Sequence, residues 1–362
     1  MTRSPRLLPL RRMGILGDDA RAGGAPGPAP GTGAAASPRT WLVLGEKAGD
    51  NAQARVIADA LGWPCETRRI VMLERWRIGK PRVRASLEHV DRERSDALEA
   101  PWPDLVLTIG RRLSMVALWI REQSQGRTRI ALIGQPRRLA DRFDLILASA
   151  QYPGPPRPNV LRLGLPLMRV DPDAVAAAAR TWEPRLAGLR RPLTAVLVGG
   201  PTKPLRLDAS VARELASRAV AVADGGTLYV TTSRRTPPEV ADALAASLPA
   251  GSPVYRFGSA GENPYLALLG LADRFVVTSD SLTMMVEVAR LGRPLAIFAL
   301  PTAKGRFFGR LGRKRDLEAV PQLLLSRGLA VRLGEPFRAP AGPTPDDLPL
   351  VVERMRALAA GG

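Results

Sequence analysis

The chain has 362 residues, 45% of them hydrophobic, and its 53 Lys and Arg outnumber 34 Asp and Glu, giving a formal net charge of +19. One cysteine, Cys65, excludes an intramolecular disulfide, and together with one histidine it is too little for a zinc site of the usual kind. The charge favours anionic partners such as nucleotides or acidic membranes, although an Ala-, Arg-, Gly- and Pro-rich composition explains it too. With 5% aromatics and no recognition motif, we expect no nucleic-acid partner.

The first residues, 1–38, are basic and then rich in Gly, Pro and Ala. We expect this extension to be disordered, with Met13 as a second candidate start. No apolar run in the sequence reaches the ~20 residues of a membrane span, and the early apolar patches are too short for a signal peptide. We therefore expect a cytoplasmic protein, with peripheral attachment to the inner face of the membrane left open.

From Thr40 onward, short apolar runs alternate with segments of helical spacing. Near-continuous Val, Ile and Leu strands between helices indicate a parallel sheet that is covered on both faces. Residues 39–168 are therefore predicted to form one α/β domain. Its expected strands are 41–45, 105–110, 129–134 and 144–149, and its first helix is 51–62.

A second series of the same kind occupies 193–345, after a connection at 169–192 and before a C-terminal helix at 346–362. Two Rossmann-like domains facing each other across a cleft form the glycosyltransferase B-type architecture, which is the fold that we expect. In such sheets, ligands bind outside the carboxyl ends of the strands. The expected strands are 193–200, 227–233, 254–257, 274–279 and 294–300, and the expected helices are 207–224, 237–248, 263–272 and 281–292.

Glycines, small polar residues and arginines gather where strands of the second domain are expected to end. Gly199 and Gly200 would let backbone N–H groups approach an anion closely. Thr236 and Pro237 are interpreted as a helix N-cap and the first helical residue. Because arginine forks and helix N-termini bind phosphate well, we predict a diphosphate site there, with plain capping and a solvated arginine pair as alternatives. The other residues of this predicted diphosphate site are Ser233, Arg234, Arg235, Ser279, Asp280 and Ser281.

A single acid, Glu287, lies among Met, Val and Ala on the helix expected at 281–292, where Ser281 is the expected cap and Thr283 lies in the first turn. A buried carboxylate needs a partner, because an unpaired buried charge is costly. A ribose diol is one suitable partner, and an ion pair with Arg290 or Arg274 is another. The place of this helix after an expected strand of the second domain favours the ribose.

Two acids follow the first strand, and either is a candidate catalytic base. We place Asp50 first and Glu46 second, with helix capping as the alternative for Asp50. The single histidine, His89, lies in a charged stretch and is expected on the solvated surface. Asp171, Pro172 and Asp173 match a metal-binding DxD pattern, but we interpret them as a helix start and expect no metal.

The order of the motifs resembles that of a known family. VLGEKAGDNAQARVIADALG, IGRRLSMVALWIR, VLVGGPTK, YVTTSRRTPPEV and the stretch 261–298 resemble the bacterial and plant family named after the plant mitochondrial fission (elongated mitochondria) factor, also described as B-type glycosyltransferases. The resemblance covers most of residues 41–300. It implies a nucleotide-sugar donor in the C-terminal domain and an acceptor in the N-terminal one, where the strand-end residues are Gly49, Asn51, Arg111, Arg112 and Gln135.

The last motif is also similar to the donor-binding end of the lipid-II-forming N-acetylglucosaminyltransferase. That similarity implies that Ser279, Ser281 and Thr283 lie near phosphate and that Glu287 holds ribose. We therefore expect an inverting, metal-independent glycosyltransferase with a nucleotide-diphospho-sugar as substrate and no cofactor. Arg234 and the helix N-terminus are the candidates for stabilising the leaving diphosphate.

Two rival interpretations remain open. A nucleotide-sugar 2-epimerase shares the fold, although such enzymes normally place several acids and histidines in the cleft. A non-catalytic scaffold at a membrane surface is the other. It rests on basic residues interleaved with aromatics, which suit an anionic membrane or a lipid-linked acceptor, and a solvated loop is the alternative. These residues include Arg306, Phe307, Phe308, Arg310 and Lys314.

Overall fold

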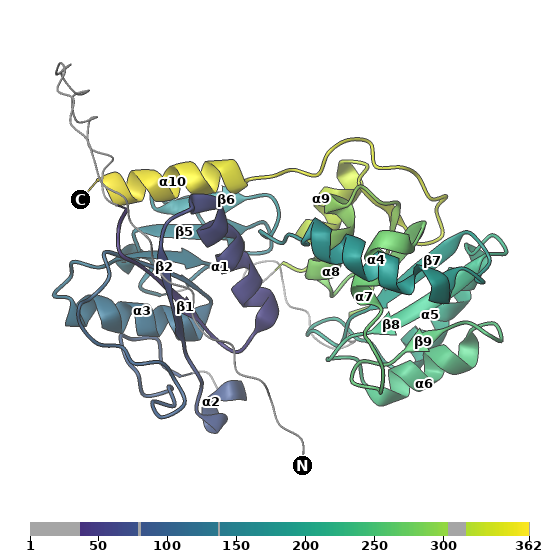
Figure 1. Ribbon diagram of the computed structural model, residues 1–362, viewed down its shortest axis with the longest axis horizontal. Coiled ribbons are helices and arrows are strands. Elements are labelled where there is room, and N and C mark those ends of the chain that lie inside the picture. Colours follow the sequence, from purple (N-terminus) through teal and green to yellow (C-terminus); the bar gives the residue numbers. More distant parts are fainter. Residues whose placement is uncertain (1–36, 79–80, 137, 303–315, 362) are drawn as a thin grey trace, which may run out of the picture. The chain divides into compact units, whose positions relative to one another are not determined.

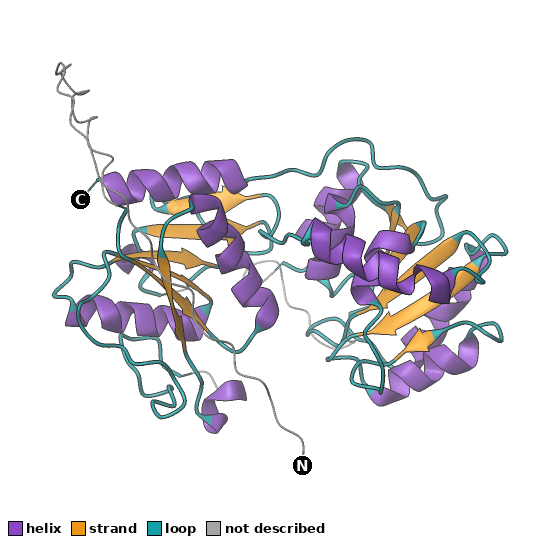
Figure 2. Cartoon of the chain, in the orientation of Figure 1, coloured by secondary structure: helices purple, strands orange, loops and turns teal. Residues whose placement is uncertain are grey.

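The chain forms two parallel α/β halves in its computed structural model, which describes residues 37–361 except 79–80, 137 and 303–315. Each half holds one six-stranded sheet with helices packed on it (Figures 1 and 2). Two successive Rossmann-like halves confirm the glycosyltransferase B type of fold. Residues 1–36 of the expected extension and all the basic and aromatic residues named for a membrane patch lie outside the described residues.

The first sheet has the strand order β2-β1-β3-β4-β5-β6, and all neighbouring strands are parallel. Chain order reverses between β1 and β3, so this pair is the topological switch point, where ligands of such sheets bind. The strands are β1 (Thr40–Leu44), β2 (Cys65–Arg69), β3 (Leu105–Ile109), β4 (Arg129–Ile133), β5 (Leu145–Ser149) and β6 (Val160–Leu163). The helices are α1 (Ala48–Leu61), α2 (Glu74–Ile78) and α3 (Arg111–Gln123), with a 3₁₀ turn η1 (Ala140–Arg142).

The second sheet has the order β12-β11-β10-β7-β8-β9, again all parallel. Its switch point lies between β7 and β10. The strands are β7 (Leu193–Val198), β8 (Thr227–Thr232), β9 (Val254–Tyr255), β10 (Arg274–Thr278), β11 (Leu295–Phe298) and β12 (Val331–Arg332). The helices are α5 (Ala209–Ala221), α6 (Pro238–Ser247), α7 (Tyr265–Leu271), α8 (Leu282–Arg290) and α9 (Ala319–Ser326).

Two helices lie outside these series, α4 (Pro172–Leu186) and α10 (Leu348–Ala360). The segment 169–192, expected as a connection, therefore contains a helix, and α4 packs on α7, where Gly270 lies against Ala179. As expected, the helix starts at the DxD-like triplet: the Asp171 carboxylate accepts from Asp173 N at 2.9 Å and Pro172 is the first helical residue. In contrast, α10 packs beside α1 and β5 of the first half (Figure 1).

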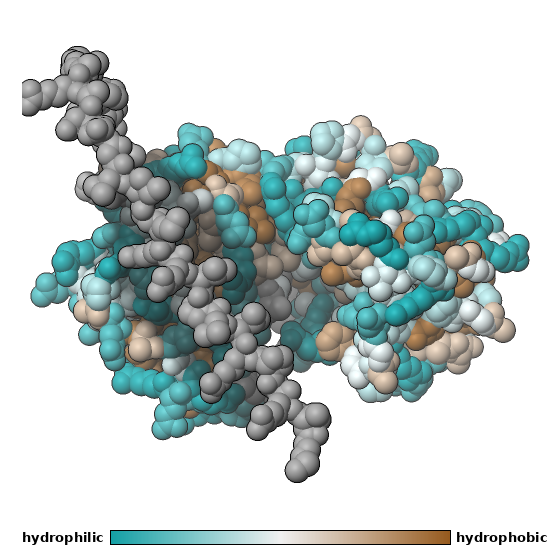
Figure 3. Space-filling model, viewed as in Figure 1, coloured by the Kyte–Doolittle hydropathy of each residue, from teal (hydrophilic) through white to brown (hydrophobic). Residues whose placement is uncertain are grey.

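The surface visible in Figure 3 is mostly polar, with apolar side chains scattered among polar ones. Among the described residues, the large apolar side chains that are exposed are Val220, Phe257, Leu266 and Leu350. No helix within this part of the chain combines the length and the apolar character that crossing a membrane requires.

Candidate functional site

The loop after β7 packs directly against the loop after β10, at the switch point of the second sheet. Gly199 N donates to Thr278 Oγ1 at 2.9 Å, and Gly200 N donates to an Asp280 carboxylate oxygen at 2.8 Å. A Cβ on Gly199 would lie 2.2 Å from the same carboxylate. The N–H groups that we expected to face a phosphate are thus already bonded. A Cβ on Gly200 would lie 2.3 Å from Arg235 O in the loop after β8, so the two glycines are needed because the loops after β7, β8 and β10 pack closely.

Arg235 and Asp280 form the centre of this packing. One guanidinium nitrogen lies 3.1 Å from the carboxylate, and the other donates to the Thr202 hydroxyl at 2.5 Å and to Gly200 O at 3.2 Å. The Asp280 side chain is fully buried, and burial raises its pKa against the opposing effect of Gly200 N–H, Thr278 and Arg235. Its Oδ1 atom has no hydrogen-bond partner in the described part of the chain. A carboxylate at this position would repel a phosphate. Asp280 instead contacts Arg235 and orients its guanidinium group.

Several of the expected phosphate ligands serve the loops instead. Ser279 Oγ accepts from Leu300 N at 3.0 Å, which ties the ends of β10 and β11 together. The Thr236 hydroxyl accepts from Ser233 N at 2.8 Å and donates to Gly199 O. Helix α6 begins at Pro238, with Pro237 at the N-cap position, so the expected Thr236–Pro237 cap lies one residue too early.

Three polar side chains that follow strands β8 and β10 have no partner among the described residues. Ser281 stands at the N-cap position and is 6% exposed, yet its hydroxyl makes no capping bond, contrary to expectation. Thr283, in the first turn of α8, and the exposed Arg234 also make no side-chain hydrogen bond or ion pair within the described residues. These groups and the first N–H groups of α8 are the ones that remain able to bind an anion.

Glu287 is partly buried and accepts a hydrogen bond from the Tyr265 hydroxyl. Neither expected ion pair forms, because Arg290 pairs with Asp346 and Arg274 with Asp224. Burial raises the pKa of Glu287 to about 7, and the Tyr265 bond opposes the shift only in part. Burial and the nearby carboxyl also raise the pKa of Tyr265, so its hydroxyl stays protonated as the donor. Sequence spacing gave no signal for Tyr265, which begins a separate helix.

In the first half, the carboxyl ends of β1 and β3 enclose a cavity of about 500 Å³, which we call the β1–β3 cavity. It lies at the switch point of the first sheet. A second hollow of about 270 Å³, lined in part by Gln135, shares Gly110, Arg111 and Tyr152 with it. The β1–β3 cavity brings together Glu46, Asp50, Asn51, Arg111 and Arg112, five of the residues expected at this edge, with Lys47 beside them.

The loop after β1 is closed by Asn51, whose amide nitrogen donates to Gly45 O at 2.7 Å and whose amide oxygen accepts from Gly45 N at 3.2 Å. Both polar atoms of Asn51 are thus used to shape the loop. Gly49 and Asp50 lie inside the first turn of α1, which starts at Ala48, so Asp50 is not the helix cap. Among the described residues, Asp50 forms an ion pair with Lys47, 4.0 Å away.

The loop after β3 leads into two arginines. Arg111 donates to Pro81 O at 2.7 Å, and Arg112 accepts through its carbonyl from the His89 ring at 2.9 Å. His89 is 0% exposed, so the expectation of a solvated surface histidine is wrong. The charged residues beside His89 in the sequence suggested an exposed ring, but the ring turns inward to the start of α3. Gln135 accepts from Arg162 at 3.0 Å.

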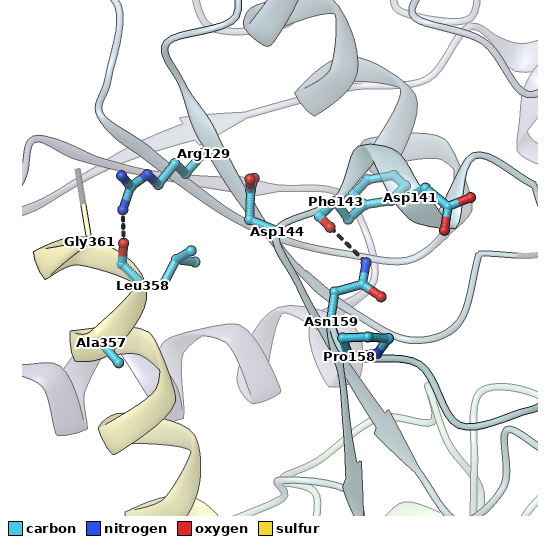
Figure 4. A pocket seen from close by; sticks show the side chains of 9 residues that line it. All are labelled: Arg129, Asp141, Phe143, Asp144, Pro158, Asn159, Ala357, Leu358 and Gly361. Atoms are coloured by element: carbon cyan, nitrogen blue, oxygen red, sulfur yellow. Dashed lines mark hydrogen bonds between the residues drawn. The ribbon is translucent and has the colours of Figure 1, made fainter.

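A third hollow, of about 660 Å³, opens at the amino ends of β4 and β5 (Figure 4). Its polar groups serve the fold: Arg129 donates to Leu358 O of α10, and Asn159 donates to Phe143 O at 2.8 Å. Ligands of open parallel sheets bind at the opposite, carboxyl ends. Among the described residues, no three His, Cys, Asp or Glu side chains gather as a metal site would require.

Among proteins of known sequence, the mitochondrial fission protein ELM1 of Arabidopsis thaliana is 28% identical over 222 residues, which are 55% of this chain and 52% of that protein. The chain thus matches about half the length of this plant relative. An uncharacterised protein of Rickettsia prowazekii is 24% identical over 275 residues, 66% of this chain and 75% of its own.

Among solved structures, UDP-GlcNAc 2-epimerase from Neisseria meningitidis aligns with a TM-score of 0.48 at 11% identity, covering 88% of this chain and 90% of that one. The family model described as mitochondrial fission ELM1 matches residues 48–318. The chain therefore belongs to the mitochondrial fission ELM1 family.

Proposed function

We propose that the protein is a glycosyltransferase that binds a nucleotide-diphospho-sugar in its second half and an acceptor in its first. The observation that carries the proposal is the arrangement at α8. The helix starts at the switch point of a Rossmann-like sheet, its first polar groups have no partner in the described chain, and a partly buried glutamate lies further along it. A helix N-terminus suits a diphosphate, and a carboxylate suits the two hydroxyls of a ribose.

In this reaction, the carboxylate of Asp50, or else of Glu46, takes the proton from the acceptor hydroxyl. The acceptor oxygen forms a bond to the anomeric carbon, and the bond from that carbon to the diphosphate oxygen breaks. The electron pair leaves with the nucleotide diphosphate, whose charge is stabilised by Arg234, Ser281 and the N–H groups at the start of α8. Arg235 is held away from this task by Asp280 and Thr202.

Calorimetric titration with UDP tests the donor site. We expect Glu287→Ala and Arg234→Ala each to weaken binding about tenfold, since each loses a charge-assisted contact worth about 1.4 kcal/mol or more. Arg327→Ala is the matched control, because Arg327 is an exposed arginine at the end of α9, outside the site. Unchanged affinity in both site variants would refute the assignment. Product analysis with UDP-N-acetylglucosamine, with and without acceptor, separates transfer from 2-epimerisation.

A further inference from the structure

The smaller hollow of the first half lies where β3 and β4 end, and we call it the β3–β4 hollow. Its volume is about 270 Å³. Two glycines that line it, Gly110 and Gly134, directly follow the two strands. Much of the remaining wall is apolar and consists of Val83, Leu132, Ile133 and Pro136. The hollow therefore offers hydrocarbon surface at the carboxyl edge of the sheet, where ligands of such folds bind.

Polar groups of the same wall are already bonded within the protein. Gly110 N donates to Ile133 O at 3.0 Å. The Ser114 hydroxyl donates to Arg111 O at 2.8 Å, and the Arg111 guanidinium donates to Pro81 O at 2.7 Å. A polar group that entered the hollow would lose its hydrogen bonds to water and find few replacements, which is costly. A hydrocarbon group loses no hydrogen bonds there, and its burial is favourable.

The β3–β4 hollow adjoins the larger β1–β3 cavity, because Gly110, Arg111 and Tyr152 line both. The larger cavity has a polar wall, to which Lys47 and Asp50 contribute. One ligand can therefore place a polar part in the cavity and an apolar part in the hollow. Apolar walls with a few polar groups that fix orientation are the usual composition of small-molecule sites.

We propose that the β3–β4 hollow binds the compact apolar group of a hydroxylated compound, whose polar part lies in the β1–β3 cavity. An apolar cavity of about 150 Å³ takes a benzene ring, so a hollow of this volume takes an apolar group of roughly eight to ten carbons. The group is thus smaller than the hydrocarbon chain of a membrane lipid. That this compound is the acceptor rests on the proposed function, but its binding does not.

Calorimetric titration with n-alkyl β-maltosides, from hexyl to tetradecyl and each below its critical micelle concentration, tests the hollow. From hexyl to octyl, we expect the affinity to rise about fourfold with each added methylene, because each one buries more apolar surface. Beyond roughly ten carbons the affinity should level off, since the hollow is then full. Absence of binding, equal affinity for hexyl and octyl maltoside, or an affinity that keeps rising to tetradecyl overturns the proposal.

Val83 is half-buried in the wall of the hollow and offers two variants with opposite effects. Val83→Phe fills part of the hollow, so octyl maltoside should bind about tenfold more weakly and the levelling off should move to a shorter chain. Val83→Ala enlarges the hollow, so the levelling off should move to a longer chain. Misfolding does not produce shifts in opposite directions.

The matched control is Val220→Phe, because Val220 is an exposed valine on α5 of the second half. It should leave the dependence of affinity on chain length as it is in wild type. If wild type and both Val83 variants show the same dependence, the maltosides bind elsewhere and the assignment to this hollow is wrong.

Titration with UDP separates this inference from the proposed function. If the maltosides bind as expected but UDP does not bind, the apolar site stands and the proposed transferase falls. If UDP binds with an affinity that depends on Arg234 and Glu287 but no maltoside binds, the donor site stands and the inference about the hollow falls.

Discussion

Glu287 and Asp280 are both acids at the carboxyl edge of the second sheet, and their surroundings give them different tasks. Asp280 is bonded to Arg235 and a backbone N–H, so it stays in place as part of the loop packing. Among the described residues, the partner of the Glu287 carboxylate is a neutral tyrosine hydroxyl, and burial raises the pKa of Glu287 to about 7. A ribose diol can replace a tyrosine hydroxyl without breaking an ion pair. This difference supports the proposal that Glu287 binds the ligand and that Asp280 positions Arg235.

The raised pKa of Glu287 makes the stability of the protein depend on pH. Between its ordinary value of 4.5 and about 7, the folded protein holds a proton that the unfolded chain has released. The free energy of unfolding therefore falls as pH rises across this window, by about 3 kcal/mol from this group. Glu287→Gln removes the titration. We therefore expect the free energy of unfolding of Glu287→Gln, measured by urea denaturation, to rise relative to that of wild type by about 3 kcal/mol between pH 4.5 and pH 7.5.

The matched control for this pH series is Glu353→Gln, because Glu353 is an exposed glutamate on α10. It should reproduce the wild-type change of unfolding free energy with pH. A stability difference between Glu287→Gln and wild type that stays constant across the window would show that Glu287 titrates normally, and with it the argument for a buried, ligand-ready carboxylate would fail.

The strand-end loops of the second sheet are held together by close backbone packing, which makes Gly199 sensitive to substitution. In Gly199→Ala, the added Cβ would lie 2.2 Å from Asp280, a fully buried side chain that has little room to move. We expect the free energy of unfolding to fall by about 1–3 kcal/mol, the usual cost of overpacking. Chemical denaturation followed by circular dichroism measures this loss.

Gly49→Ala is the matched glycine control in the first half. Nothing lies within 4 Å of a Cβ at Gly49, which is exposed in the first turn of α1. Its stability should stay unchanged or rise by up to about 1 kcal/mol, since alanine favours helix over glycine. Equal effects of the two substitutions would mean that the loop after β7 is not tightly packed.

At the scale of elements, a strand could be predicted from the sequence where it coincides with an apolar run. The central strands of both sheets, such as 193–198, are nearly continuous apolar stretches and could be predicted closely. Strand β2, with the sequence CETRR, is a polar edge strand and left no such signal. Gly199 and Gly200 did indicate a close approach. The groups that approach them, however, are Asp280 at Gly199 and the backbone of Arg235 at Gly200, and no local pattern reveals contacts between residues so far apart in sequence. The Tyr265–Glu287 contact was missed for the same reason.

At the scale of the whole molecule, the described residues form two halves of similar construction, each with candidate residues at its switch point. The chain does not divide between these halves in sequence order. After the second sheet is complete, α10 packs on the core of the first half, where Leu348, Val351 and Met355 are buried. Asp347, directly before α10, accepts from Gly164 N at 2.7 Å. The first half is therefore incomplete without the last residues of the chain, which the order of the apolar runs did not indicate.

This arrangement predicts that a substitution near the C-terminus destabilises the N-terminal half. Met355 is 0% exposed, so Met355→Ala should lower the free energy of unfolding by about 2–5 kcal/mol. Five of the six tryptophans lie before residue 120, so tryptophan fluorescence in urea reports chiefly on the first half. In Met355→Ala, the midpoint of the fluorescence transition should shift to a lower urea concentration. Arg356→Ala, at the exposed next position, should change stability by no more than about 0.5 kcal/mol. If Met355→Ala leaves the fluorescence midpoint where it is in wild type, α10 does not belong to the core of the first half.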